Sequence, residues 1–151
     1  MASTLFTNAR IVDGTAPEAG APVSVLVEGG TIREVGKAVT SAKAKIVDLK
    51  GKTLMPGLID AHVHVVAGVA DLGRNAQLPD SLVTARSFVI MREMLMRGFT
   101  PVRDVGGADF GLKQATEEGH FPTPRLVISG KALSQTGGHA DFRGRYDDAA
   151  T

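Results

Sequence analysis

Hydrophobic and polar positions alternate in short runs over the first third of the chain, a pattern typical of β-structure. A strand candidate at residues 4–12 is followed by two apolar-rich runs that the pair Gly29-Gly30 joins. Such a pair is a strong hairpin signal because both residues readily take positive φ. A further segment turns around Lys50-Gly51. We expect three or four short antiparallel strands within residues 1–55, which are too few to bury a core alone.

The hydrophobic pattern changes after Pro56-Gly57: longer apolar runs follow, and some apolar residues recur at helical spacing. Short connections between strands and helices favour a parallel sheet with right-handed crossovers. Pro101 lies awkwardly in its strand because it has no N–H to donate, so pairing there is expected to begin after it. The pattern predicts, in order, a strand at 58–65, a helix at 80–98, a strand at 99–105, a helix at 107–119 and a strand at 124–130.

The longer helix carries apolar residues at helical spacing, and both of its ends have signals. Asp80 or Ser81 can cap its start, and Gly98 can end it. The expected apolar positions are Leu82, Ala85, Phe88, Val89, Leu95 and Met96.

Composition narrows the possible functions without choosing one. The chain has 151 residues, 43% hydrophobic and 22% charged, with a net charge of +1. A net charge so close to zero does not indicate the basic surface that binding nucleic acid or an anionic membrane requires. The chain contains no Cys, so any metal must take nitrogen and oxygen ligands. No apolar run is long enough to span a membrane, and the N-terminus does not read as a signal peptide, so a cytoplasmic protein is expected.

The segment "LMPGLIDAHVHV" (54–65) places ionisable groups on one face of an apolar strand. Because side chains alternate, Asp60, His62 and His64 share one face, whereas Ile59 and Val65 fall on the other, which suits packing under helices. Burying such groups without partners costs on the order of several kcal/mol. Two imidazoles at i and i+2 lie roughly 6–7 Å apart and can converge on one divalent ion such as zinc. The alternative is a pair of core histidines bonded to backbone or water.

The same segment resembles the entry strand of the amidohydrolase superfamily, in which Pro-Gly, an acid and His-x-His follow a small β-sandwich. The segments "VEGGTIREVG" and "VDLKGKTLMPG" resemble the N-terminal sheet of that family, and "GFTPVRDVGG" resembles its second barrel strand. "PTPRLVISGKALSQTGGHADFR" resembles the third strand and its loop in the imidazolonepropionase-like branch, which includes enzymes that cleave Xaa-Pro dipeptides. The resemblance covers nearly the whole chain.

The resemblance implies an α/β fold. Residues 1–56 are the first part of a small β-sandwich domain, and residues 57–151 begin a (β/α)8 TIM barrel that needs about 250 residues. It also implies one or two divalent ions, expected to be zinc, held in part by His62 and His64. The remaining ligands, including a carboxylated lysine, would come from later strands. We therefore expect a further barrel segment, in the same polypeptide or as a separate chain, and little activity from these residues alone.

Four other residues are candidates for the site. By resemblance, His139 in the loop after the third strand looks like a catalytic or substrate-contacting group; the alternative is an exposed loop histidine. Arg143 could pair with a substrate carboxylate in forked geometry, although a surface arginine is as reasonable. Asp60 and Asp104 are expected to support the metal ligands. The alternatives are a buried hydrogen bond to the neighbouring strand for Asp60, and a structural ion pair or a turn cap for Asp104.

These observations lead to one preferred function and three alternatives. The preferred one is hydrolysis of a C–N bond by a metal-activated water, on an N-acyl amino acid or a dipeptide such as Xaa-Pro. A cyclic amidase, a deaminase of the same superfamily or a non-catalytic fragment lacking the remaining ligands stays open. We expect a small-molecule or dipeptide substrate, a homo-oligomer, and neither nucleic acid nor a membrane as partner.

Overall fold

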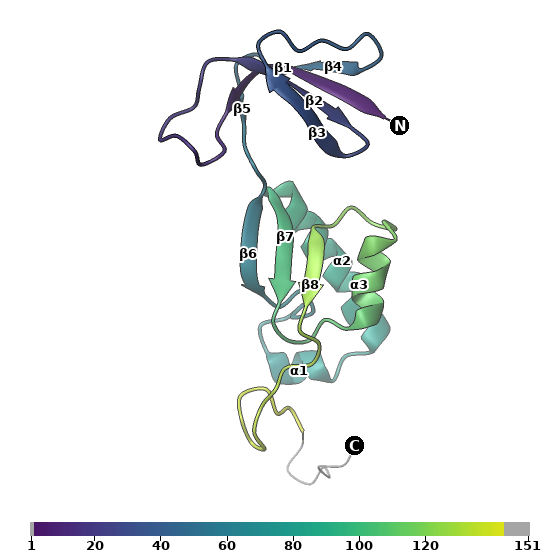
Figure 1. Cartoon of the computed structure of the whole chain (residues 1–151). Helices are drawn as coiled ribbons and strands as arrows, with labels where there is room; N and C mark the ends of the chain where they lie inside the picture. Colours follow the sequence, from purple (N-terminus) through teal and green to yellow (C-terminus); the bar gives the residue numbers. More distant parts are fainter. Residues whose placement is uncertain (1, 144–151) are drawn as a thin grey trace. The chain divides into compact units, whose positions relative to one another are not determined.

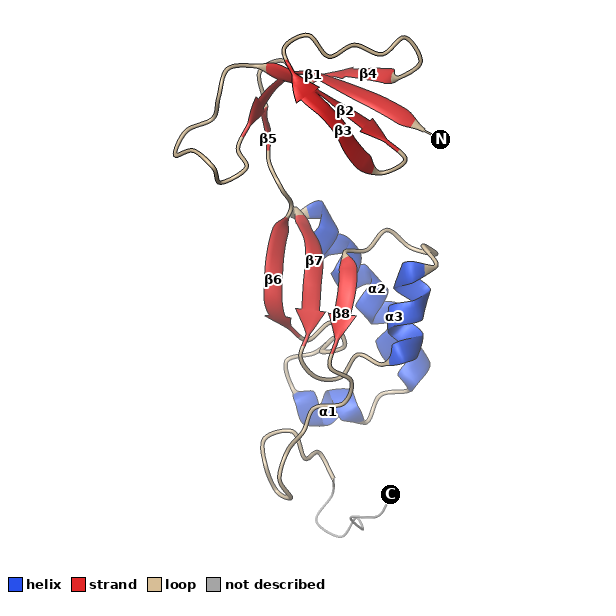
Figure 2. Ribbon diagram, viewed as in Figure 1, coloured by secondary structure: helices blue, strands red, loops and turns tan. Residues whose placement is uncertain are grey.

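The chain divides into two compact units, Met1–Pro56 and Gly57–Thr151. The computed structural model describes residues 2–143 (Figure 1). Strands make up the first unit, whereas the second combines strands with helices (Figure 2). No helix within the described range combines the length and apolar character that crossing a bilayer requires.

The first unit is a twisted sheet built around its first strand. Along the sheet the order is β3-β2-β1-β4, and β5 also pairs with β1. The expected hairpin is confirmed: Gly29 and Gly30 have φ of 57° and 79°, as a turn with two left-handed residues requires. A small core forms from Leu5, Leu26 and Val39. The strands are β1 (Ser3–Ile11), β2 (Val23–Glu28), β3 (Thr31–Gly36), β4 (Lys45–Asp48) and β5 (Thr53–Leu54).

The expectation that this sheet is antiparallel throughout is wrong. Strands β4 and β5 both pair with β1 in parallel, β4 with its first half and β5 with its end. Asn8, with φ of 55°, lies on β1 between the two pairings, and the Lys50-Gly51 turn lies beside it. The Gly51 N–H donates to the Asn8 carbonyl at 2.9 Å. The turn therefore carries the chain onward along β1 instead of folding β5 back onto β4.

The second unit is a three-stranded parallel sheet with its two longer helices against one face, and its short helix lies beyond the carboxyl ends of the strands (Figures 1 and 2). The predicted alternation of strands and helices is confirmed, so the chain is an α/β protein in this part. The strands are β6 (Leu58–Val63), β7 (Phe99–Asp104) and β8 (Arg125–Ile128), and the helices are α1 (Leu72–Ala76), α2 (Asp80–Met96) and α3 (Phe110–Glu117).

The core of this unit lies between the sheet and helices α2 and α3. Val102 of β7 and Leu126 of β8 pack against Met91 and Met94 of α2 and Leu112 of α3. The predicted apolar face of α2 is only partly right. Phe88 packs against the core, but Val89 and Met96 are 58% and 72% exposed, whereas Ser87 is fully buried. Apolar residues occur on several sides of this helix, so their spacing did not single out the packed face.

Three other local expectations need correction. Pro79 occupies the N-cap of α2 and no side chain caps it, although Gly98 does follow its end with φ of 97°. Pairing of β7 starts at Phe99, before Pro101. The register of β6 against β7 shifts between the pairs Leu58–Phe99 and Asp60–Val102, so Pro101, which has no N–H to donate, falls within the irregular part of the pairing. Ile59 is 73% exposed, because α2 and α3 cover the other strands.

Candidate metal and substrate site

His62 lies near the carboxyl end of β6 and His64 directly follows the strand, and both are on the side opposite the core. Val65 is fully buried and Val63 packs against the core, whereas both histidines are exposed. Their ring centroids are 5.5 Å apart with an interplanar angle of 77°. Alternation along the strand therefore brings the two rings together, in an arrangement that permits convergence on one ion.

Only one nitrogen of His64 is available to a ligand. Its Nδ1 lies 2.9 Å from the Gly106 carbonyl oxygen. A carbonyl can only accept, so Nδ1 must donate, and the lone pair of neutral His64 is on Nε2. Metal-binding histidines commonly use one ring nitrogen in this way and coordinate with the other.

A cavity of about 540 Å³ opens beside the two histidines. Its walls come from the segments that follow β6, β7 and β8, and from α1. His139 lines the same cavity, so three of the predicted site residues meet here. The remaining walls are mostly apolar, with Leu72, Leu133 and Phe142 among them. A hollow at the carboxyl edge of a parallel sheet is where α/β proteins bind ligands.

The donor set present fits part of a metal site. Within residues 2–143, no group of three or more His, Asp or Glu side chains is arranged to hold a metal ion. Two imidazoles are suitable nitrogen ligands for zinc, which takes four ligands in protein sites. His62 and His64 can thus supply two positions, and further ligands would have to come from elsewhere.

Asp104, at the end of β7, is fully buried and accepts three backbone N–H groups. Its Oδ2 accepts from Val65 at 2.7 Å, and its Oδ1 accepts from Gly106 at 2.9 Å and Ala108 at 3.2 Å. It does not line the cavity. The carboxylate instead joins the segment after His64 to the turn that follows β7.

Asp60 is half-buried and bonds within its own strand. Its Oδ1 accepts from the backbone N–H of His62 at 3.1 Å. Arg103, on the strand beside it, donates through Nε to the Ala61 carbonyl at 2.8 Å. Both contacts support the backbone of β6 rather than a histidine ring.

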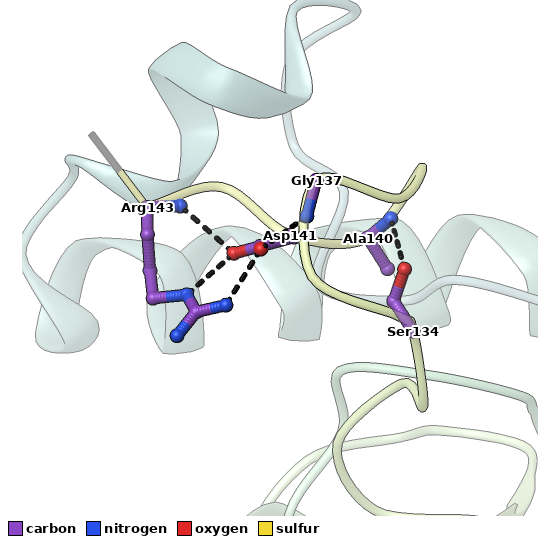
Figure 3. Close-up of polar contacts among 5 residues, drawn as sticks. All are labelled: Ser134, Gly137, Ala140, Asp141 and Arg143. Carbon is purple, nitrogen blue, oxygen red and sulfur yellow. Dashed lines mark hydrogen bonds and ion pairs between the residues drawn. The ribbon is translucent and has the colours of Figure 1, made fainter. Parts of the chain in front are cut away.

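The loop after β8 is held by an ion pair between Asp141 and Arg143 (Figure 3). Two guanidinium nitrogens donate to the two carboxylate oxygens, each at 2.7 Å, and the Gly137 N–H adds a bond of 2.8 Å. The Arg143 bonds, supported by Gly137, hold the pKa of Asp141 well below its usual value. The forked geometry expected of Arg143 is therefore present, but with a carboxylate of its own loop.

Sequence reasoning missed Asn75 and the short helix α1 that carries it. Asn75 Nδ2 donates to the Val66 carbonyl and its Oδ1 accepts from the Gly68 N–H, both at 3.1 Å. These bonds fasten the segment after His64 against α1, at the cavity wall. Asp71, which caps α1 by accepting from the Arg74 N–H, was the one signal that could have revealed the helix.

Comparison with known proteins assigns this chain to a family. The model of the amidohydrolase family matches residues 53–150, which include the histidine strand and the cavity. The chain belongs to the amidohydrolase family. The resemblance read from the sequence is thus confirmed.

The proteins that match this chain include an imidazolonepropionase and a Xaa-Pro dipeptidase, the two enzyme types that the resemblance named. An imidazolonepropionase of Vibrio vulnificus (strain YJ016) is 42% identical over 66 residues, which cover 41% of this chain and 16% of that protein. A solved amidohydrolase structure is 53% identical with a TM-score of 0.90, over 97% of this chain and 36% of its own. A prolidase complexed with N-methylphosphonate-L-proline is 47% identical with a TM-score of 0.90, and the match covers 96% of this chain and 36% of the prolidase chain. The chain thus spans about a third of these solved proteins.

Proposed function

We propose that this amidohydrolase chain supplies part of the active site of a metal-dependent hydrolase of C–N bonds. The observation that carries the proposal is the pair of rings of His62 and His64, 5.5 Å apart at a cavity that His139 also lines. In the same proposal, the second unit is the first part of a TIM barrel and the first unit is part of a β-sandwich. The later strands would supply the other ligands, a carboxylated lysine among them.

His62 and His64 would hold the ion, which we propose to be zinc, and Nε2 of His64 would be the coordinating atom. When bound, such an ion lowers the pKa of a water ligand to about 7 and polarises a carbonyl group. His139 would contact the substrate from the loop after β8. Arg143 already donates to Asp141 through Nε and Nη2, so it would bind a substrate carboxylate either alongside these bonds or in exchange for them.

We propose an N-acyl amino acid or a dipeptide such as Xaa-Pro as substrate. The prolidase with a proline phosphonate, 47% identical over 96% of this chain, supports this choice. The apolar cavity walls at Leu72, Leu133 and Phe142 suit an uncharged acyl or side-chain group. The imidazolonepropionase relative favours a second candidate, a cyclic amidase, with which the histidine pair is equally compatible.

Metal content tests the ligand assignment directly. We expect elemental analysis to find less bound metal in His62→Ala and His64→Ala than in the wild type. His120→Ala is the matched control, because His120 is exposed, pairs with Glu118 at 2.8 Å and does not line the cavity. Equal metal in all four proteins would end the proposal.

A substrate panel separates the candidate functions. Prolyl dipeptides and N-acyl amino acids would report the preferred activity, and imidazolones and lactams the second. Each is measured on this chain and again with any polypeptide that completes the barrel. Metal binding with no turnover in either form would favour a non-catalytic role.

A further inference from the structure

We infer that Asp104 is a positioning residue for His64, acting through the turn that contains Gly106. This deepens the proposed function and rests on it, because it names what orients one proposed metal ligand. Asp104 touches neither the imidazole nor the cavity. Its influence passes through backbone groups on both sides of the histidine contact.

The first step is the bond between His64 and the Gly106 carbonyl, 2.9 Å long. That carbonyl selects the Nδ1–H tautomer, because the opposite tautomer would set a lone pair against a carbonyl oxygen. With Nδ1 engaged, Nε2 carries the lone pair that a metal needs. The position of one backbone carbonyl therefore decides which nitrogen of His64 can coordinate.

The second step is what holds that carbonyl in place. It belongs to the peptide between Gly106 and Gly107, whose N–H donates to the Gly130 carbonyl at 2.9 Å. The N–H groups of Gly106 and Ala108, immediately before and after this peptide, both donate to Oδ1 of Asp104. One carboxylate oxygen thus restrains the turn on either side of the His64 contact.

The third step is the other carboxylate oxygen. Oδ2 of Asp104 accepts from the N–H of Val65, the residue that follows His64, at 2.7 Å. Asp104 thereby holds both partners of the histidine bond, the carbonyl and the backbone beside the ring. Its full burial excludes water from competing for these donors.

A role confined to capping the strand end would predict lost stability and nothing more. The positioning role predicts in addition that the tautomer of His64 changes. Val102→Ala is the matched control, because Val102 lies two residues earlier on β7, is 1% exposed and belongs to the apolar core, but its side chain makes no hydrogen bond to the turn or to Val65. It lowers stability while leaving the three hydrogen bonds of Asp104 in place.

The test compares Asp104→Ala and the milder Asp104→Asn with Val102→Ala and the wild type. Two-bond ¹⁵N–¹H correlation spectra of the metal-free proteins, at about pH 8.5, report the tautomer of His64 well above the ordinary histidine pKa of about 6.5. Zinc affinity is measured by competition with a chelator. We expect Nδ1–H in the wild type and Val102→Ala. In both Asp104 variants we expect a mixture of tautomers and an affinity about 10- to 100-fold weaker.

An unchanged His64 tautomer together with the zinc affinity of Val102→Ala would overturn the inference. Should Asp104→Ala fail to fold, Asp104→Asn decides between the two roles, since it keeps the shape and one acceptor oxygen. Failure of the proposed function is a separate result. It would appear as unchanged metal in His62→Ala, whereas the tautomer is read without metal.

Discussion

Replacing Gly107 by Ala tests how tightly the turn after β7 fits against the segment after His64. Gly107 has φ of 122°, a conformation that side chains rarely adopt, and a Cβ added there would lie 2.4 Å from Cγ2 of Val66. Backbone strain costs about 1–3 kcal/mol. Forcing the methyl groups apart costs about another 1–3 kcal/mol. We therefore expect a loss of about 2–6 kcal/mol in the free energy of unfolding, by adding these two terms.

Gly119→Ala is the control that separates the two terms. Gly119 also has positive φ, 73°, but nothing lies within 4 Å of an added Cβ. Strain alone should cost about 1–2 kcal/mol there. Val66→Ala combined with Gly107→Ala should recover part of the larger loss, because the facing methyl is gone, with a coupling of about 0.5–3 kcal/mol.

Urea titrations followed at the helical far-ultraviolet circular dichroism band give these free energies. All helices of the described residues belong to the second unit, so this signal reports the unit that carries Gly107. Equal losses for Gly107→Ala and Gly119→Ala, with no coupling to Val66, would refute the close contact between the turn and the segment after His64.

Three further predictions concern the core, the cavity wall and the last loop. Met91→Ala should lower the free energy of unfolding by about 2–5 kcal/mol, because Met91 is fully buried; a loss below about 1 kcal/mol, typical of a surface change, would contradict this packing. Asn75→Ala should speed hydrogen exchange at the Gly68 amide, which loses its acceptor, and unchanged exchange would rule out that bond. The depressed pKa of Asp141 means that its contacts persist at the ordinary carboxyl value of 3.8 and are lost only as the pH falls further. Exchange at the Gly137 amide should therefore rise in that acidic range, and the acid response should vanish in Asp141→Asn.

Local signals in the sequence predicted local structure well. The Gly29-Gly30 pair predicted a hairpin because two successive positive φ values satisfy few other structures. Alternation along one strand predicted that His62 and His64 share a face, and their rings lie 5.5 Å apart. In both cases the signal and the structure lie within a few residues of each other.

What the sequence could not predict depends on residues far apart in the chain. Asp104 binds Val65, 39 residues away, and no pattern in the sequence indicates which backbone groups a buried carboxylate accepts. The parallel pairing of β4 and β5 with β1 likewise depends on contacts across some forty residues. The side of α2 that packs was ambiguous because apolar residues lie around Met91 and also on the exposed side at Val89.

The double pairing of β1 has a consequence for the order of events during synthesis. One edge of this strand is completed first by β4 and then by β5, so its last partner is Leu54. Until β4 and β5 have been synthesised, β1 is paired with β2 on one edge only, and its other edge is exposed. Such non-local closure is slow compared with hairpin formation. That edge of β1 therefore stays open to pairing with another chain until Leu54 has been synthesised.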